Sequence, residues 1–335
     1  CTTKINSGTT PRAARTPSAA ERENLRTGYG SASSNRVPCA AEARLGSRRR
    51  PPHPSREPRG VLAYVTGAAG FVGSHVVDAL LGRGWDVVGI DNLSTGNQRN
   101  LADAARNEGF RFVRADVSLP WSPWAADSDA ERGAPQLVMH LASPASPVHY
   151  ERLALETLAV NAVGTMHAAT FAHDVGAQFL YASTSESYGD PLEHPQRETY
   201  WGNVNPVGIR SCYDESKRFG EAYVTTAVRK LGVDARIVRI FNTYGPRMQA
   251  GDGRVIPNFC VSALRGEPLT IYGDGSQTRS FCYVDDLVDG LIRLATTPAL
   301  AGRVVNLGNP GEYTIRQLAE AVSYTHLTLP TILRV

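Results

Sequence analysis

Tyr213 and Lys217 stand four residues apart in the segment SCYDESKRFGEAY. On a helix this spacing brings both side chains to one face, so that a lysine ammonium lies close to a tyrosine hydroxyl. A free tyrosine has a pKa of about 10, and a neighbouring positive charge favours its phenolate form. Such a pair can therefore act as a base toward a substrate hydroxyl. Because the same spacing often arises by chance on amphipathic surface helices, its interpretation depends on the segments that accompany it.

A second group of reactive side chains follows the predicted strand Gln178–Ala182, in the segment YASTSESYGD. Thr184, Ser185 and Glu186 supply two hydroxyls and a carboxylate just beyond that strand. Open α/β sheets bind their ligands at the carboxyl ends of the strands. We therefore predict that these three residues belong to the same site as the tyrosine–lysine pair.

A glycine-rich turn follows the first predicted strand, Leu62–Thr66. Gly67, Gly70 and Gly73 come at three-residue intervals, and a predicted helix follows them. Glycines let the backbone turn tightly and approach a pyrophosphate, and a helix N-terminus supplies free N–H groups. The spacing is G-x-x-G-x-x-G rather than the G-x-G-x-x-G of the standard dinucleotide fingerprint. The alternative is a tight strand-to-helix turn that binds nothing.

Asp91 ends the second predicted strand, eighteen residues after the last of these glycines. A carboxylate at this position can accept hydrogen bonds from the ribose 2′-hydroxyl of a dinucleotide and would repel a 2′-phosphate. The sequence therefore predicts NAD rather than NADP as the cofactor.

Predicted strands and helices alternate along the chain. The apolar runs that predict strands are Leu62–Thr66, Asp86–Ile90, Phe110–Arg114, Leu137–Leu141, Gln178–Ala182 and Asp234–Phe241. Helical patterns between them include His75–Arg83, Thr157–Asp174 and Glu215–Leu231. This alternation predicts an α/β fold with a Rossmann-type, doubly wound parallel sheet that is covered on both faces.

Charge and composition argue against several classes of protein. Residues 1–59 contain eleven Arg and one Lys against four Glu, so the net charge of +3 comes from this segment and the remainder is acidic. We therefore expect no nucleic-acid partner for the folded part. The five cysteines are far apart and form no pair such as C-x-x-C, which predicts a cytoplasmic protein without structural disulfides and without a metal. No apolar run reaches the roughly 18 residues that span a bilayer, so we expect no membrane segment.

Four segments are predicted along the chain. Residues 1–59 are interpreted as a disordered or non-native basic tail, because they cannot bury enough apolar surface to fold. Residues 60–245 form the NAD-binding domain, and residues 246–322 form a smaller substrate-binding region interleaved with the last sheet elements. The helical pattern of EYTIRQLAEAV breaks off after Val322. We therefore expect the substrate-binding region to be truncated and residues 323–335 to be a non-native end.

The glycine turn, STSE and YDESK together resemble the extended short-chain dehydrogenase/reductase family. Four longer segments are similar to the UDP-glucuronate decarboxylases of that family: HLASPASP (His140–Pro147), YWGNVNPVGIRSCYDESKR (Tyr200–Arg218), RIFNTYGPRM (Arg239–Met248) and YGDGSQTRSFCYVDDLV (Tyr272–Val288). The resemblance extends from about Val61 to Val322. It implies an NAD-dependent decarboxylation of UDP-glucuronate to UDP-xylose through a C4-keto sugar.

The resemblance also implies a role for each reactive residue. Tyr213 would deprotonate the sugar C4 hydroxyl, Lys217 would hold down the pKa of that tyrosine and bind the nicotinamide ribose, and Thr184 would hydrogen-bond the reacting oxygen. Glu186, helped by Ser185, would position the sugar and assist protonation at C5. The residues implied to bind the cofactor, besides Tyr213 and Lys217, are Gly67, Gly70, Phe71, Val72, Gly73, Asp91, Asn92, Thr95, Gly96, Asp116, Val117, Leu141 and Ser143. Those implied to bind the substrate are Asn242, Arg254 and Arg279.

Related enzymes remain as alternatives. Sugar-nucleotide 4,6-dehydratases usually have Thr-Asp-Glu where this chain has Thr184-Ser185-Glu186, and 4-epimerases lack that acid pair. The serine removes the acid that would expel a C6 hydroxyl, which favours decarboxylation over dehydration. The other alternative is a truncated, catalytically silent NAD-binding fragment.

Two further expectations concern the surroundings of the site. Ala159 stands where relatives often carry a Lys near the sugar, and His140, at the end of a predicted strand, is interpreted as structural. Relatives pair through two helices, which here would be those around Thr157–Asp174 and Glu215–Leu231. The resemblance thus implies a homodimer.

Overall fold

The structure of the protein is a computed structural model that describes residues 60–121 and 133–326. The interpretation of residues 1–59 as a tail lies outside the described residues, as does the interpretation of residues 327–335 as part of a non-native end.

Seven parallel strands form the central sheet, in the order β3-β2-β1-β4-β5-β6-β10. Their bounds are β1 (Leu62–Thr66), β2 (Asp86–Asp91), β3 (Phe110–Arg114), β4 (Leu137–His140), β5 (Gln178–Thr184), β6 (Ala235–Ile240) and β10 (Val304–Leu307). The order reverses between β1 and β4, which is the switch point where such sheets bind ligands. The prediction of a doubly wound parallel sheet is confirmed. The sequence patterns gave no indication of β10, and β5 runs two residues further than predicted, which makes Thr184 its last residue.

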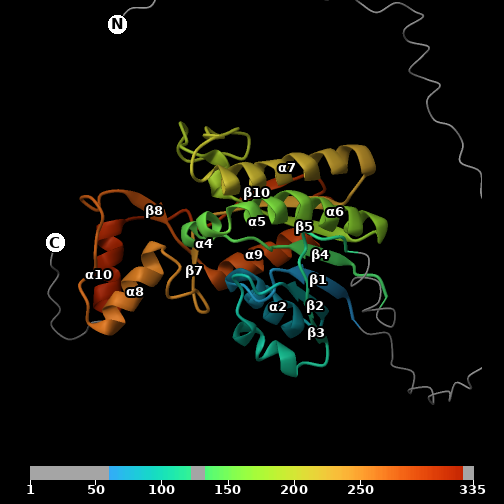
Figure 1. Cartoon of the computed structure of the whole chain (residues 1–335), viewed down its shortest axis with the longest axis horizontal. Helices are drawn as coiled ribbons and strands as arrows, with labels where there is room; N and C mark the ends of the chain where they lie inside the picture. Colours follow the sequence, from blue (N-terminus) through green and yellow to red (C-terminus); the bar gives the residue numbers. More distant parts are fainter. Residues whose placement is uncertain (1–59, 122–132, 327–335) are drawn as a thin grey trace, which may run out of the picture. The chain divides into compact units, whose positions relative to one another are not determined.

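Helices cover both faces of the sheet (Figure 1). On one face lie α2 (Phe71–Gly82) and α9 (Val284–Thr296). On the other face lie α6 (Thr165–Asp174) and α7 (Ser211–Leu231). No helix of the described residues is long and apolar enough to cross a membrane.

Side chains of β1 alternate between two hydrophobic cores, as the period of a strand requires. Ala63 and Val65 belong to the core beneath α2 and α9, and Leu62 and Tyr64 to the core beneath α6 and α7. Burial on both faces explains why the strands read as continuous apolar runs rather than as an alternating pattern.

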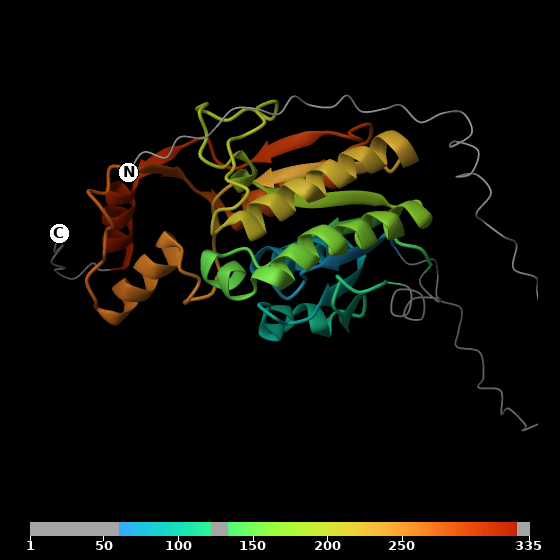
Figure 2. The same cartoon turned by 45° about the horizontal axis from the view of Figure 1, so that its top comes forward.

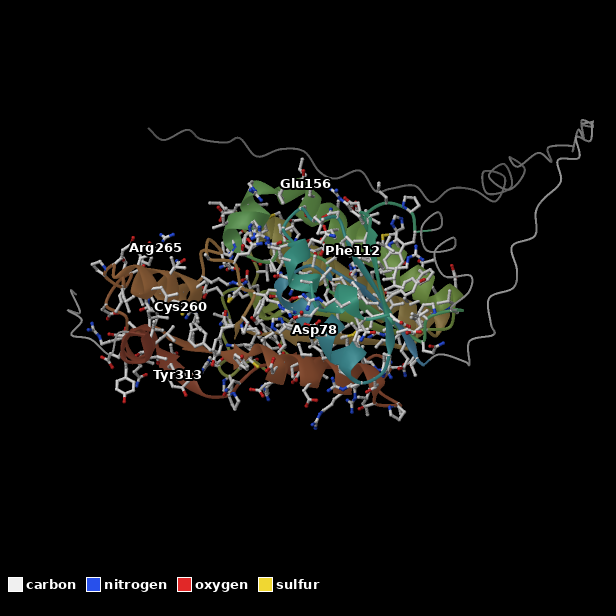
Figure 3. The ribbon with its side chains drawn as sticks, turned by 90° about the horizontal axis from the view of Figure 1, so that it is seen from below. Asp78, Phe112, Glu156, Cys260, Arg265 and Tyr313 are labelled. Carbon is white, nitrogen blue, oxygen red and sulfur yellow. The ribbon has the colours of Figure 1, made fainter. Side chains whose placement is uncertain are left out.

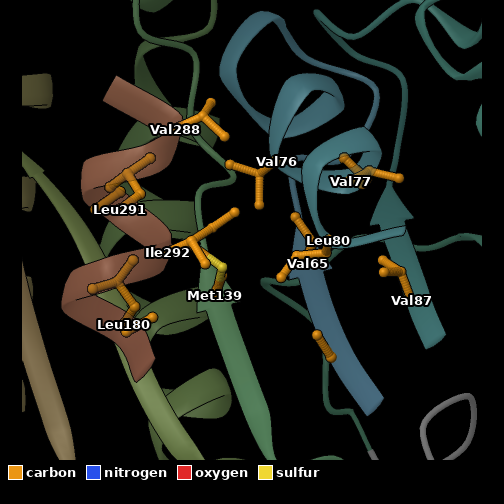
Figure 4. Close-up of a cluster of buried hydrophobic side chains, with 14 of the residues drawn as sticks. Val65, Val76, Val77, Leu80, Val87, Met139, Leu180, Val288, Leu291 and Ile292 are labelled. Atoms are coloured by element: carbon orange, nitrogen blue, oxygen red, sulfur yellow. The ribbon is translucent and has the colours of Figure 1, made fainter. Parts of the chain in front are cut away.

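Figure 4 shows the first of these cores, where side chains of two helices meet over the sheet. Val76 and Leu80 come from α2, Ile292 comes from α9, and Met139 comes from β4. All of these side chains are buried. The core joins β1 and α2 to α9, which lies about 200 residues later in the sequence, and so holds the glycine turn and α9 in one unit.

The helix predicted at Thr157–Asp174 begins earlier and is interrupted. It starts as α5 (Ala154–Ala159), widens into a π-helical turn at Val160–Gly164, and continues as α6. Within the wide turn the buried Asn161 donates a hydrogen bond from Nδ2 to Oγ of Ser216 in α7, at 3.0 Å. Such turns are frequent at functional sites, because they redirect side chains without ending the helix.

A smaller group of elements comes from segments on both sides of β10 in the sequence. It contains α8 (Val255–Arg265), α10 (Ile315–His326) and the antiparallel pair of β8 (Thr278–Ser280) and β11 (Glu312–Thr314). Figure 2 shows α8 and α10 next to each other at the opposite end from the tips of α6 and α7. Phe259 and Ala263 of α8 pack with Ala319 of α10 in a separate hydrophobic cluster. Helix α10 continues past Val322 to His326.

Short elements complete the described chain. These are α4 (Pro147–Arg152), the paired strands β7 (Thr243–Tyr244) and β9 (Cys282–Tyr283), and single turns of 3-10 helix at Gln98–Leu101, Ala104–Arg106 and Ser185–Tyr188. The three cysteines of the described residues, at positions 212, 260 and 282, form no disulfide.

Candidate active site

A cavity of about 900 Å³ opens at the carboxyl ends of the parallel strands. Every predicted site residue lines it except Gly96. An added Cβ on Gly96 would lie 2.9 Å from Oδ1 of Asp91, so this glycine packs against the carboxylate instead of facing the cavity. The structure thus brings together residues that are as far apart in sequence as Gly67 and Arg279.

The glycine turn presents bare backbone to this cavity. Gly67 has a φ of +70°, in the left-handed region that favours glycine. An added Cβ on Gly73 would lie 2.0 Å from the carbonyl oxygen of Gly67, so only glycine lets α2 begin this close to β1. Gly70 is the N-cap residue of α2, and no side chain caps this end of the helix with a hydrogen bond. The free N–H groups and the positive end of α2 fit the pyrophosphate of a dinucleotide.

Asp91 is almost fully buried at the end of β2. Its carboxylate accepts backbone hydrogen bonds from Ala69 at 3.0 Å and from Leu93 at 2.7 Å. Burial raises its pKa, and these two hydrogen bonds offset part of the rise. The carboxylate therefore fixes the turn beside the cavity. Its remaining lone pairs can accept a hydrogen bond from a ribose hydroxyl.

Asp116 forms the neighbouring acidic wall. Burial alone would raise its pKa, but hydrogen bonds from Ser118 and Asn92 outweigh burial and lower it. The Asn92 amide lies 3.2 Å from Oδ2 of Asp116. This second carboxylate is therefore ionised at neutral pH, which suits a contact with hydroxyl groups and not with phosphate.

Tyr213 and Lys217 lie on the first turns of α7 with their side chains nearly enclosed. The Lys217 ammonium donates a hydrogen bond to the carbonyl oxygen of Ala182 at 2.8 Å and lies 5.9 Å from the centre of the Tyr213 ring. Burial lowers the pKa of Lys217 to about 7. The Tyr213 ring stacks on that of Tyr150 in α4, with 5.0 Å between ring centres.

The expected depression of the Tyr213 pKa is not present in the chain alone. Burial raises this pKa first, and the negative charge of Glu186 raises it further. The hydrogen bond from Thr184 and the positive charge of Arg254 lower it only in part. Desolvation therefore outweighs the effect expected from the neighbouring cation, and it also weakens the charge on Lys217.

Glu186 is the second residue of the 3-10 turn Ser185–Tyr188 that follows β5, and its backbone N–H donates a hydrogen bond to the hydroxyl of Thr184 at 3.2 Å. Its carboxylate forms an ion pair with Arg210, which lies over the Tyr150 ring. Arg210 lines the cavity but was not predicted. The sequence could have indicated this residue through its position three residues before Tyr213, because this spacing places both residues on one helical turn.

The substrate side of the cavity is formed by Asn242, Arg254 and Arg279. Arg254 is held by Asp252, with its Nη2 at 2.7 Å from Oδ2. A second cavity, of about 280 Å³, shares Asn242, Arg254 and Arg279 with the first, and its walls include Tyr272.

The loop between β7 and α8 ties this side to the cofactor side. Arg247 lies 2.6 Å from Asp78 of α2, and Gln249 donates a hydrogen bond to the carbonyl oxygen of Thr95 at 2.5 Å. Asp78 is labelled on α2 in Figure 3, where Cys260 and Arg265 mark α8.

His140 and Ala159 are the two residues expected in the surroundings of the site. His140 is fully buried, its Nδ1 lies 2.8 Å from Oγ1 of Thr66, and burial lowers its pKa to about 3. It is therefore neutral and holds the end of β4 against β1. Ala159 lines the cavity, so this wall carries a methyl group.

The sequence pattern of the NAD dependent epimerase/dehydratase family matches residues 63–308, which is most of the chain. The chain belongs to this family. Membership confirms the prediction of NAD as the cofactor, and the bare glycine turn fits that cofactor.

Curated relatives confirm the resemblance found in the motifs. UDP-glucuronic acid decarboxylase 1 of Arabidopsis thaliana is 53% identical over 77% of this chain and 57% of its own length. UDP-glucuronic acid decarboxylase 3 of the same plant is 49% identical over 77% of this chain and 72% of its own length. The chain thus spans little more than half the length of the first of these relatives.

Solved structures agree with the fold. The epimerase Mth375 of Methanothermobacter thermautotrophicus superposes with a TM-score of 0.72 and 29% identity, over 80% of this chain and 78% of that chain. UDP-glucuronic acid 4-epimerase of Bacillus cereus, in complex with UDP-glucuronic acid and NAD, has a TM-score of 0.69 and 27% identity, over 79% of this chain and 81% of that chain.

The glycine turn makes a testable prediction about cofactor binding. Gly73→Ala places a methyl group against the Gly67 carbonyl, so the turn must open, and we expect NAD affinity to fall by at least about tenfold, as judged by calorimetry. Gly82→Ala, at the other end of α2, is the matched control because an added Cβ meets nothing within 4 Å there. Equal NAD affinities for the two variants would contradict this account of the turn.

Proposed function

We propose that the protein decarboxylates UDP-glucuronate to UDP-xylose through a C4-keto sugar, with NAD recycled at each turnover. The observation that carries the proposal is one cavity that joins the glycine turn to Tyr213, Thr184, Ser185 and Glu186. The names of the curated relatives support the same substrate. Ser185 favours decarboxylation over dehydration, because it cannot act as the acid that expels a C6 hydroxyl.

The chain's own residues supply the proton transfers. Tyr213 takes the proton of the C4 hydroxyl, with Thr184 hydrogen-bonded to the reacting oxygen and Lys217 and Arg254 as the nearby positive charges. Bound NAD would supply hydride transfer at C4 in both directions, so the net reaction would consume no cofactor. The resulting ketone lies β to the C5 carboxylate, so the C5–C6 bond can break, its electron pair moving toward the C4 oxygen as CO₂ leaves. Glu186 and Ser185 hold the ring while C5 gains a proton that comes ultimately from solvent water, and Tyr213 returns its proton to the C4 oxygen.

Substrate binding is proposed to use both cavities. Arg254 and Arg279 line each of them, and guanidinium groups bind phosphate oxygens through paired hydrogen bonds. A diphosphate held by these two residues directs the sugar toward Tyr213 and the uracil toward the second cavity, where Tyr272 offers an aromatic face. Asn242 lies between the two spaces and can donate to the same diphosphate.

The proposed assembly is a cytoplasmic homodimer. Large apolar side chains are exposed along the helices expected to pair: Leu155, Leu158, Val163 and Met166 on the α5–α6 segment and Phe219 on α7. Exposed apolar side chains gathered on neighbouring helices are typical of an interface between copies. Light scattering on the purified protein should give the mass of two chains, and the mass of one chain would refute the pairing.

The proposed reaction is tested directly with UDP-glucuronate and NAD. We expect release of CO₂ and formation of a UDP-pentose, both followed by mass spectrometry. A product with the mass of the substrate but a changed C4 configuration would indicate a 4-epimerase, and loss of water would indicate a dehydratase. NAD binding with no conversion of UDP-glucuronate would indicate a silent binding module.

Tyr213→Phe tests the base. The change keeps the ring that stacks on Tyr150 and removes only the ionisable oxygen. The turnover rate should fall by ~10²–10⁴-fold while UDP-sugar affinity is retained, because a lost general base costs about this much. Tyr324→Phe, on the exposed surface of α10, is the control. A normal rate of cofactor reduction in Tyr213→Phe would exclude this residue as the base.

Glu186→Gln should give a different signature. Oxidation at C4 depends on Tyr213 and continues, whereas the later steps slow down, so reduced nicotinamide should accumulate and absorb in the near ultraviolet. Glu215→Gln, whose carboxylate pairs with Arg218 at 3.6 Å, should behave like the wild type. Unchanged turnover in Glu186→Gln would show that this carboxylate takes no part.

A further inference from the structure

Asp214 follows Tyr213 on α7 and lies outside the lining of the cavity, behind Glu186. Its side chain is almost completely buried, with 9% of the residue exposed. Oδ1 is fully enclosed, and none of the described groups donates a hydrogen bond to it. A buried carboxylate oxygen without a donor is strongly destabilising, so this position requires an explanation.

The hydrogen bond of the Asp214 carboxyl is made with the carboxyl group of Glu186. Ionised carboxylates accept hydrogen bonds and cannot donate them, so two carboxyl groups in contact need a proton between them. Glu186 is engaged by the guanidinium of Arg210 in an ion pair. The proton therefore belongs on Asp214, with Glu186 as the ionised partner.

We propose that Asp214 is a positioning residue that acts through Glu186: its protonated carboxyl donates a hydrogen bond to the Glu186 carboxylate. Asp214, Glu186 and Arg210 then carry no net charge beside the bound sugar. The inference rests on the proposed function, because a substrate that brings its own carboxylate is the one for which this neutrality matters. With Asp214 ionised, the same group of three would carry a net negative charge and repel that carboxylate.

Several charged or titratable groups surround Asp214. They are Glu186 after β5, Arg210 before α7, Tyr150 from α4, and Cys212, Tyr213 and Glu215 from α7 itself. Burial and then the Glu186 charge raise the pKa of Asp214 to about 7, against which Arg210 acts only in part. Asp214 is thus protonated below neutrality and ionises as the pH rises through it.

The first experiment needs no turnover. In infrared difference spectra between about pH 6 and about pH 8.5, ordinary carboxyl groups stay ionised and only those with a raised pKa change. We expect a protonated-carboxyl band that titrates near neutrality in the wild type, is absent in Asp214→Asn, and has a lower midpoint in Glu186→Gln. Glu215→Gln should keep the band. A wild type without this band, or a band that survives in Asp214→Asn, would overturn the proposal.

The second experiment measures the affinities of UDP-glucuronate and UDP-glucose by calorimetry over the same range. Wild-type affinity for UDP-glucuronate relative to UDP-glucose should fall roughly tenfold as Asp214 ionises, because only the glucuronate carries the additional charge. Asp214→Asn keeps a donor toward Glu186 and cannot ionise, so its ratio should stay constant. Lys217 also loses charge in this range, but it does so in both proteins. The same pH dependence in both proteins would contradict the proposal.

These outcomes separate the inference from the proposed reaction. If the wild type forms no UDP-pentose while the titrating band and the affinity ratio behave as expected, the reaction assignment fails and the carboxyl pair stands. If the UDP-pentose forms but the band is missing, the pair fails and the reaction stands. A melting curve for Asp214→Asn checks that the variant is folded, and the Glu186→Gln midpoint tests the pair without that variant.

Discussion

The close packing of helix α7 on strand β5 is the constraint on which the rest of the site depends. An added Cβ on Gly220 would lie 2.1 Å from the hydroxyl of Tyr181, so the helix can approach the strand only because this position is glycine. That approach lets Lys217 reach the carbonyl oxygen of Ala182 and brings Tyr213 beside Thr184. A helix held further from the sheet would separate Tyr213 from the hydroxyl of Thr184, the two groups that we propose act on the reacting oxygen.

A buried ion pair at the residue after Gly220 also holds α7 against the sheet. Glu221 of α7 binds Arg239 of β6 through both carboxylate oxygens, at 2.9 and 2.7 Å, and accepts a hydrogen bond from Ser183 of β5 at 2.6 Å. The guanidinium of Arg239 also lies over the ring of Tyr188, which ends the turn that carries Glu186. Helix, two strands and the acidic turn are thus linked through one charged group, whose removal would leave a buried charge unpaired.

Desolvation shifts the pKa values of the side chains that this packing encloses. Burial works against the charged form of every group it encloses, which raises the pKa values of Tyr213 and Asp214 and lowers that of Lys217. In the chain alone the tyrosine is therefore neutral, and the proposed role as a base requires that neighbouring positive charges such as that of Arg254 favour its ionised form. In the same enclosed space the carboxylate of Glu186 forms an ion pair with Arg210.

Local patterns in the sequence determined the strand-helix alternation, the glycine turn and the four-residue spacing of Tyr213 and Lys217, because each depends on neighbours along the chain. The confirmed parallel sheet and NAD follow from these. Only the tertiary structure decided what depends on distant segments: the placement of β10 beside β6, the pairing of Arg210 with Glu186, and the position of Gly96 against Asp91. The direction of the Tyr213 pKa shift belongs to the same class, since the sequence supplies the neighbouring cation but not the extent of burial that outweighs it.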